Sequence, residues 1–261
     1  MQIWINFPLN SFPTTGKALE FIYPFIRMPV LSILASRSFP DGDDVGDLTG
    51  MVAELDQKGD KSFSLLSDAY DLISATKSIL FRKDRPSQTE YFVLALGNDS
   101  DVQLPELLLA ASAAGMTFAY KTEYTKDRWQ SEEKLNAYEV ENRPHAHLKK
   151  IIDPTKPLIL QTRIDISENP GHARLTYTMK LMAAPEMWFG PGCWAYFDKQ
   201  RVSSFPDAAE VRWLGPDLLY IRLFDWTVPD YEAGHILRLQ ERFRQSSGMD
   251  EVEVQLEGML P

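Results

Sequence analysis

The sequence contains little cysteine and lacks the common catalytic motifs. Cys193 is the only cysteine among 261 residues, so the chain cannot form an internal disulfide and gives no sign of an oxidising compartment. It contains no Gly-x-Gly-x-x-Gly, no phosphate-binding loop and no Gly-x-Ser-x-Gly motif. These absences exclude the familiar nucleotide-binding and serine-hydrolase signatures, and we expect no cofactor.

Long apolar runs are also missing. No stretch approaches the roughly 18 consecutive apolar residues that a membrane-spanning helix needs. The first residues, MQIWINFPLNSFP, have neither the basic region nor the small-residue cleavage site of a signal peptide. We therefore expect a cytoplasmic protein.

Positive charge is in the minority. The chain has 37 acidic and 27 basic residues, which gives a net charge of −10. Nucleic-acid phosphates repel such a protein, so a basic protein partner is a better match than DNA or RNA. The densest acidic stretch is FPDGDDVGDLTG, and it contains four predicted partner-binding residues: Asp41, Asp43, Asp44 and Asp47.

This acidic segment has two open interpretations. It is either a solvated loop, kept out of a helix by its glycines, or an acidic surface that binds a basic partner. A calcium-binding EF-hand loop fits poorly, because Val45 and Val52 stand where that loop requires oxygen ligands.

The order of predicted elements indicates an α+β fold. A strand, a helix begun by proline and ended by Gly-Met, and a second strand are predicted in each half, at residues 90–96, 104–115 and 116–125, and again at 218–225, 228–248 and 249–257. We interpret this as two similar α/β lobes, residues 1–150 and 151–261. Each would have a mainly antiparallel sheet packed by helices, and a degenerate duplication is one explanation of the likeness.

Three further segments have clear patterns. Alternation on both sides of Glu-Asn-Pro-Gly predicts a hairpin over residues 157–182. Apolar residues at helical spacing predict an amphipathic helix over residues 62–81. Residues 128–142 are expected to form a helix that Pro144 interrupts.

Two groups of residues contain side chains that are typical of catalytic or metal sites. Cys193 lies in PEMWFGPGCWAYF without a base at any known spacing, and its aromatic neighbours Trp188 and Trp194 favour a small buried side chain in a packed turn. His145 and His147 have the spacing of some metal ligands, but they follow a proline and precede two lysines. We therefore predict neither a catalytic residue nor a metal site.

The segments MWFGPGCWAYFDKQRV and VRWLGPDLLYIRLFD resemble bacterial immunity proteins of polymorphic-toxin and type VI secretion systems. The most similar ones neutralise toxins with a restriction-endonuclease-like domain. The resemblance covers these segments together with the helix and strand predicted after them. It implies a protein that binds a cognate toxin, such as a nuclease, and blocks it by occluding or distorting the active site. It assigns no role to the acidic segment.

Two other functions remain open at this point. One is a small-molecule hydrolase or transferase that uses carboxylates and a histidine. The other is an adaptor protein of a secretion apparatus.

Overall fold

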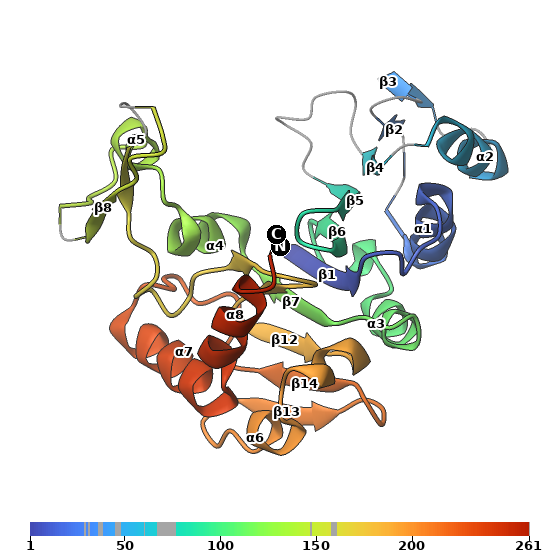
Figure 1. Cartoon of the computed structure of the whole chain (residues 1–261). Helices are drawn as coiled ribbons and strands as arrows, with labels where there is room; N and C mark the ends of the chain where they lie inside the picture. Colours follow the sequence, from blue (N-terminus) through green and yellow to red (C-terminus); the bar gives the residue numbers. More distant parts are fainter. Residues whose placement is uncertain are drawn as a thin grey trace.

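The computed structural model describes residues 1–28, 30, 32–35, 39–44, 48–59, 61–66, 77–146, 148–157 and 161–260 (Figure 1). Its centre is a sheet of ten strands in the order β13-β14-β12-β7-β1-β6-β5-β4-β2-β3, and every neighbouring pair is antiparallel. The α+β fold class is therefore confirmed. The strands are β1 (Gln2–Pro8), β2 (Ser32–Ala35), β3 (Phe39–Asp44), β4 (Ser62–Leu66), β5 (Ser78–Asp84), β6 (Thr89–Ala95), β7 (Phe118–Thr122), β12 (Glu186–Phe189), β13 (Glu210–Trp213) and β14 (Leu219–Arg222).

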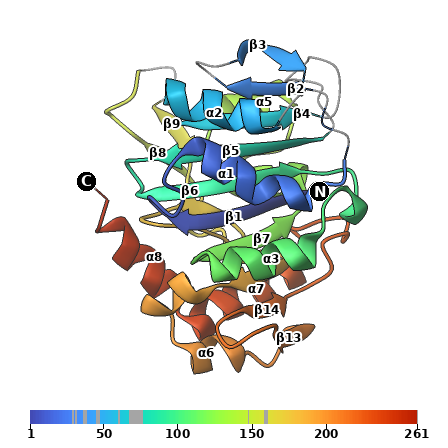
Figure 2. The same cartoon turned by 90° about the vertical axis from the view of Figure 1, so that its right-hand side faces the viewer.

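Helices cover both faces of this sheet (Figures 1 and 2). On one face lie α1 (Thr15–Ile22), α2 (Leu48–Lys58) and α3 (Leu104–Ala113). On the other lie α4 (Tyr124–Ser131), α6 (Lys199–Ser203), α7 (Gly234–Ser247) and α8 (Met249–Glu257). An arm outside the sheet contains α5 (Leu135–Val140) and the pair β8 (Lys150–Ile152) and β9 (Thr162–Ile164), while β10 (Arg174–Leu175) and β11 (Lys180–Leu181) form a second small pair.

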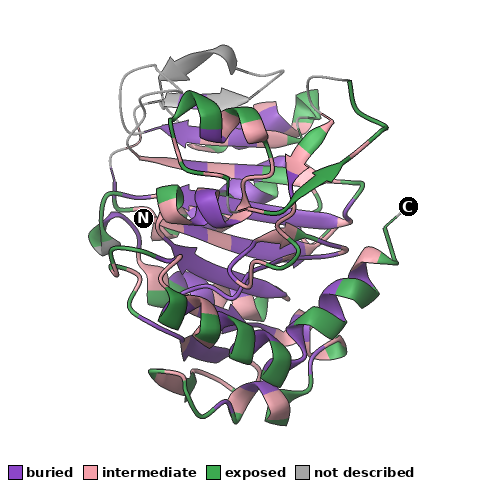
Figure 3. Cartoon of the chain, turned by 90° about the vertical axis from the view of Figure 1, so that its left-hand side faces the viewer, coloured by how far each residue is buried: buried purple, intermediate pink, exposed green. Residues whose placement is uncertain are grey.

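Side-chain alternation produces two hydrophobic cores, one on each face. Along β1, Ile3, Ile5 and Phe7 belong to the core shared with α1, α2 and α3. Along β7, Phe118 and Tyr120 belong to the core under α6, α7 and α8. Successive residues of a strand point to opposite faces, so strands buried on both sides carry apolar residues at almost every position. Figure 3 shows these central strands coloured as buried.

The two halves of the chain share this single sheet. The predicted boundary between residues 150 and 151 falls within β8, and β12 beyond it pairs with β7 before it, as in Trp188 opposite Ala119. The halves therefore do not build separate sheets. Several predicted elements are confirmed in place: β6, α3 and β7 in the first half, and β14 and α7 in the second.

The helix predicted over residues 62–81 is wrong. Its ends are the antiparallel strands β4 and β5, with Phe63 opposite Phe81 and Leu65 opposite Ile79; residues 67–76 lie outside the described part of the chain. These four side chains alternate along the two strands and enter the core under α1 and α2. A short apolar run satisfies helical and strand periods equally well, and tertiary pairing decided between them.

The strand predicted over residues 249–257 is also wrong, because this segment is the helix α8. Met249, Val252 and Leu256 are buried together at spacings of three and four, which is a helical period. Gly248 ends α7 as predicted, with a φ of 78° that favours glycine. The repeat of strand, helix and strand is thus incomplete in the second half.

The predicted hairpin over residues 157–182 is wrong in its pairing. Its first strand, β9, pairs with β8, so that Arg163 lies opposite Ile151. Its second strand is divided into β10 and β11, which pair with each other. The helix expected over residues 128–142 is divided into α4 and α5.

Candidate partner-binding surface

The predicted acidic site lies at one edge of the sheet. Asp41, Asp43 and Asp44 belong to β3, the last strand in the sheet order, and Asp47 lies outside the described residues. The expected loop is therefore a strand over Phe39–Asp44, and the backbone of this strand pairs with β2, as in Asp43 opposite Ile33. The sequence did not predict this strand, because aspartate and glycine have low strand propensity. Pairing with a neighbouring strand can override that propensity. The role of these aspartates in binding a partner protein stays a prediction.

Acidic residues are dense in one interval of the sequence. Residues 39–60 contain seven carboxylates and one lysine, a charge of −6 out of the total of −10. They include β3 and α2, and α2 covers the adjoining part of the sheet in both views (Figures 1 and 2). Two of the carboxylates have internal partners: Glu54 Oε1 lies 2.5 Å from Lys58 Nζ, and Asp56 Oδ1 accepts a 2.8 Å hydrogen bond from the Gly16 amide.

Cys193 lies in a packed aromatic turn, as predicted. It is fully buried in a short 3-10 helix, Pro191–Ala195, and burial raises the pKa of its thiol well above the ordinary value. The backbone at Gly190 lies so close to Met116 that only glycine fits there, because an added Cβ would lie 2.3 Å from the Met116 carbonyl oxygen. A thiol held neutral in an apolar core is a poor nucleophile, so this site does not suit covalent catalysis.

The two tryptophans beside the turn differ in burial. Trp188 is buried and belongs to the core under α3, as expected. Trp194 is only half-buried; its Nε1 donates a 2.9 Å hydrogen bond to the Asp217 carbonyl, and its ring stacks on Phe189. Both rings therefore have structural contacts.

The candidate histidine pair is described only in part, since His147 lies outside the described residues. His145 is half-buried, with its ring edge against Tyr138. Within the described part of the chain, no group of three or more histidine, cysteine, aspartate or glutamate side chains could hold a metal ion.

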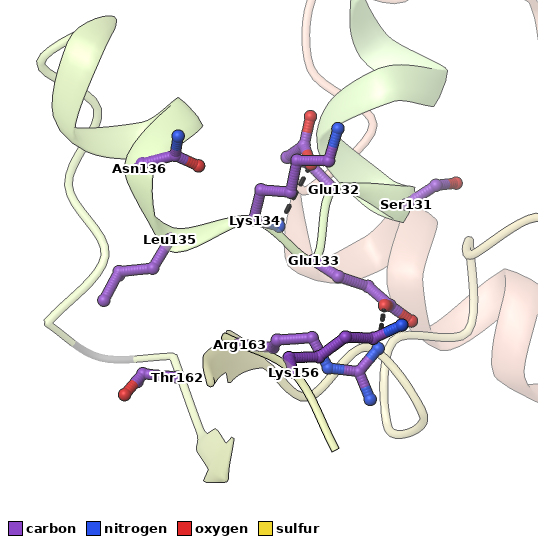
Figure 4. Close-up of a pocket in the computed structure, with 9 residues that line it drawn as sticks. All are labelled: Ser131, Glu132, Glu133, Lys134, Leu135, Asn136, Lys156, Thr162 and Arg163. Atoms are coloured by element: carbon purple, nitrogen blue, oxygen red, sulfur yellow. Dashed lines mark hydrogen bonds and ion pairs between the residues drawn. The ribbon is translucent and has the colours of Figure 1, made fainter. Parts of the chain in front are cut away.

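A cavity of about 440 Å³ opens where the arm meets α4 (Figure 4). Its acidic and basic side chains come from the turn between α4 and α5, from the segment between β8 and β9, and from β9. Arg163 Nη1 lies 2.5 Å from Glu133 Oε2, and the Lys134 amide donates a 3.0 Å hydrogen bond to Glu132 Oε1. Ser131 Oγ accepts a hydrogen bond from the Ala173 amide and lies 3.3 Å from an Asp127 oxygen. The carboxylates and hydroxyl thus hold the arm in place, and none is arranged as an activated nucleophile.

A buried ionic network, which the sequence did not reveal, fixes the C-terminal helices. Glu253 on α8 accepts a 2.9 Å hydrogen bond from His172 Nε2 and a 2.5 Å bond from Arg244 Nη2 on α7. The other ring nitrogen of His172, Nδ1, faces the Asn169 carbonyl oxygen, so both ring nitrogens lie beside acceptors. Burial alone would raise the pKa of Glu253, but the bond with His172 and the charge of Arg244 lower it to about 2.

A second buried pair of charges lies between β1, α4 and β11. The Lys180 ammonium is 3.8 Å from the centre of the Trp4 ring, and burial lowers the pKa of Lys180. Burial likewise raises the pKa of Asp127, although Lys180 opposes that shift. Such shifts occur in acid–base sites and in structural networks alike. Neither residue was singled out by the sequence, because neither belongs to a local motif.

No helix among the described residues is long and apolar enough to cross a membrane. No family model and no curated protein matches the chain. Among solved structures, the chain is similar to the Pseudomonas aeruginosa T6SS protein PA0821, with 12% identity and a TM-score of 0.49. The match covers 95% of this chain and 72% of that one.

Proposed function

We propose that this chain is an immunity protein that binds a cognate toxin with a basic, nuclease-like surface and blocks it without catalysis. The observation that carries the proposal is the concentration of negative charge in residues 39–60, which have a net charge of −6 and include the edge strand β3 and the helix α2. The resemblance to immunity proteins, which covers roughly the last hundred residues, supplies the kind of partner.

Electrostatics explains why such a surface suits this partner. A nuclease groove is built to attract phosphate, so it also attracts a dense group of carboxylates. Exposed charges act over a Debye length of about 10 Å at 0.1 M salt, and they accelerate encounter more than they slow dissociation. The acidic end of the sheet would therefore steer the toxin into place.

The edge position of β3 adds a second type of contact. Among the described residues, β3 has a strand neighbour on one side only, and a partner can pair with the other side of its backbone. Charged side chains on the same strand discourage pairing with a second copy of this acidic protein, whereas a basic partner neutralises them. The surface would thus favour a basic partner over self-association.

The test uses the protein encoded by the adjacent reading frame as the candidate toxin. The quadruple variant changes these residues to asparagine: Asp41, Asp43, Asp44 and Asp47. We expect slower association and a weaker dependence of the association rate on salt, with little change in the melting temperature. Rates are measured by surface plasmon resonance at low and high salt, and protection is measured as survival of cells that express the toxin.

A matched variant separates local charge from total charge. It neutralises the same number of carboxylates at exposed positions elsewhere: Glu106, Glu139, Asp207 and Glu241. We expect it to associate at nearly the wild-type rate. Equal slowing in both variants would mean that only the net charge matters. Failure of the wild-type protein to bind or to protect would refute the immunity function itself.

A further inference from the structure

A second cavity, of about 420 Å³, lies far along the sheet from β3, between α3 and the strands β7, β12 and β14. Its volume is within the range of small-molecule sites. Trp188 and Tyr220 project from neighbouring strands on this face, with ring centres 5.3 Å apart. Leu104 and Leu108 of α3 face them across the groove, and Leu109 at the rim is 49% exposed.

The polar groups deep in this groove already satisfy one another. Lys121 Nζ lies 3.3 Å from Glu186 Oε1, and the Tyr220 hydroxyl donates a 3.0 Å hydrogen bond to Glu186 Oε2. The carboxylate of Glu186 is thus neutralised, and it presents no net charge to a ligand. The inner part of the groove therefore favours an apolar group.

Arg212 of β13 supplies a cation at the mouth. Its side chain is 60% exposed, and its Nε lies 3.6 Å from Glu210 Oε1, which exceeds hydrogen-bonding distance. Arg222 is placed equally far from the other oxygen of Glu210, so two guanidinium groups share one carboxylate. Asp225 also interacts electrostatically with Arg222. Arg212 is therefore the exposed cation beside the apolar groove, and its contact with the Glu210 carboxylate is beyond hydrogen-bonding distance.

We propose that this groove binds a small aliphatic carboxylate. The aliphatic part of the ligand lies between α3 and the rings of Trp188 and Tyr220, and its carboxylate pairs with Arg212. Guanidinium is the side-chain group best matched to a carboxylate, because it offers two parallel N–H donors. This inference is independent of toxin binding, which is assigned to the opposite edge of the sheet.

Octanoate is the probe, and isothermal titration calorimetry at neutral pH is the assay. We expect saturable binding of octanoate, weaker binding of octanol and none of octylamine. Affinity should rise by up to about four-fold for each methylene from butanoate to octanoate, because each buried methylene adds hydrophobic free energy. Equal affinity for octanoate and octanol would overturn the assignment of Arg212.

Three variants of Arg212 and one control sharpen the test. Arg212→Gln should weaken octanoate binding by about 10- to 100-fold, as expected for a lost charge-assisted hydrogen bond. Arg212→Lys should retain part of the affinity, and Arg212→Glu should favour octylamine. The control is Arg242→Gln, because Arg242 is 57% exposed and pairs instead with Asp207. It should bind octanoate as the wild type does.

Two results would overturn the proposal. One is the absence of saturable octanoate binding by wild-type protein that is folded by circular dichroism. The other is tighter binding of a short peptide ending in Leu-Leu with a free carboxylate than of octanoate, since the groove would then be a site for a chain terminus. Measuring octanoate and the peptide on the same protein preparation distinguishes a fatty-acid site from a site for a peptide C-terminus.

Discussion

Replacing Glu253 by glutamine tests the network that joins the last two helices to the chain before β10. The substitution keeps the shape of the side chain but removes the charge that pairs with Arg244 and His172. Because the pKa of Glu253 falls from 4.5 to about 2 on folding, the linkage contribution is about 3 kcal/mol of unfolding free energy at neutral pH. Glu253→Gln should therefore lose about 3 kcal/mol, in the range for breaking a buried ion pair.

The pH dependence has a definite sign. A carboxyl whose pKa is lowered by folding stabilises the protein above its unfolded value of 4.5, and this contribution is lost as the pH falls from there toward 2. The difference in unfolding free energy between wild type and Glu253→Gln should thus be largest near pH 7 and decrease as the pH falls below 4.5. Urea unfolding, followed by circular dichroism at a series of pH values, measures it.

Glu251→Gln provides a control on the same helix. Glu251 pairs with Arg201, but its side chain is 70% exposed, so water and salt screen the pair. We expect its urea midpoint to stay close to that of the wild type. The reasoning would be refuted if Glu253→Gln were as stable as Glu251→Gln at neutral pH, or if its deficit did not diminish in acid.

Three further predictions concern the aromatic turn. Cys193→Ala should cost about 1 kcal/mol and leave toxin binding unchanged, and the wild-type thiol should react with a thiol reagent only on unfolding, because it is buried. Trp188→Ala should lose about 3–5 kcal/mol in urea unfolding, and Trp194→Ala should lose less because its ring is half-buried; equal losses would contradict this ranking. Gly190→Ala should lower the melting temperature, whereas Gly215→Ala, where an added Cβ meets nothing within 4 Å, should not.

Local patterns were sufficient for much of the fold. Pro105 near the first turn and Gly115 just after the last turn delimit α3, and the apolar runs of the buried strands β6 and β7 were recognisable. The turn around Cys193 was also predictable, because a thiol among large aromatic rings has few alternatives to burial. Each of these features depends on neighbours within a few residues.

Local patterns failed where a segment suits two structures. Residues 62–66 and 249–257 illustrate this, since each contains apolar side chains compatible with a helix or a strand. The first became a strand because it pairs with β5, and the second a helix because its buried side is shared with α7. Such choices depend on partners distant in the sequence, which no local window contains.

The sequence alone determined how much charge the chain carries and where it is dense, since the −6 of residues 39–60 is a property of composition. It also determined that Cys193 would be an inert, buried thiol. Contacts between distant segments, by contrast, place Phe39–Asp44 at the end of the strand order, bring His172 to Glu253 and put Arg212 at the mouth of an apolar groove. The physical reason is that edges, buried ion pairs and cavities arise from contacts between distant segments, and folding alone brings those segments together.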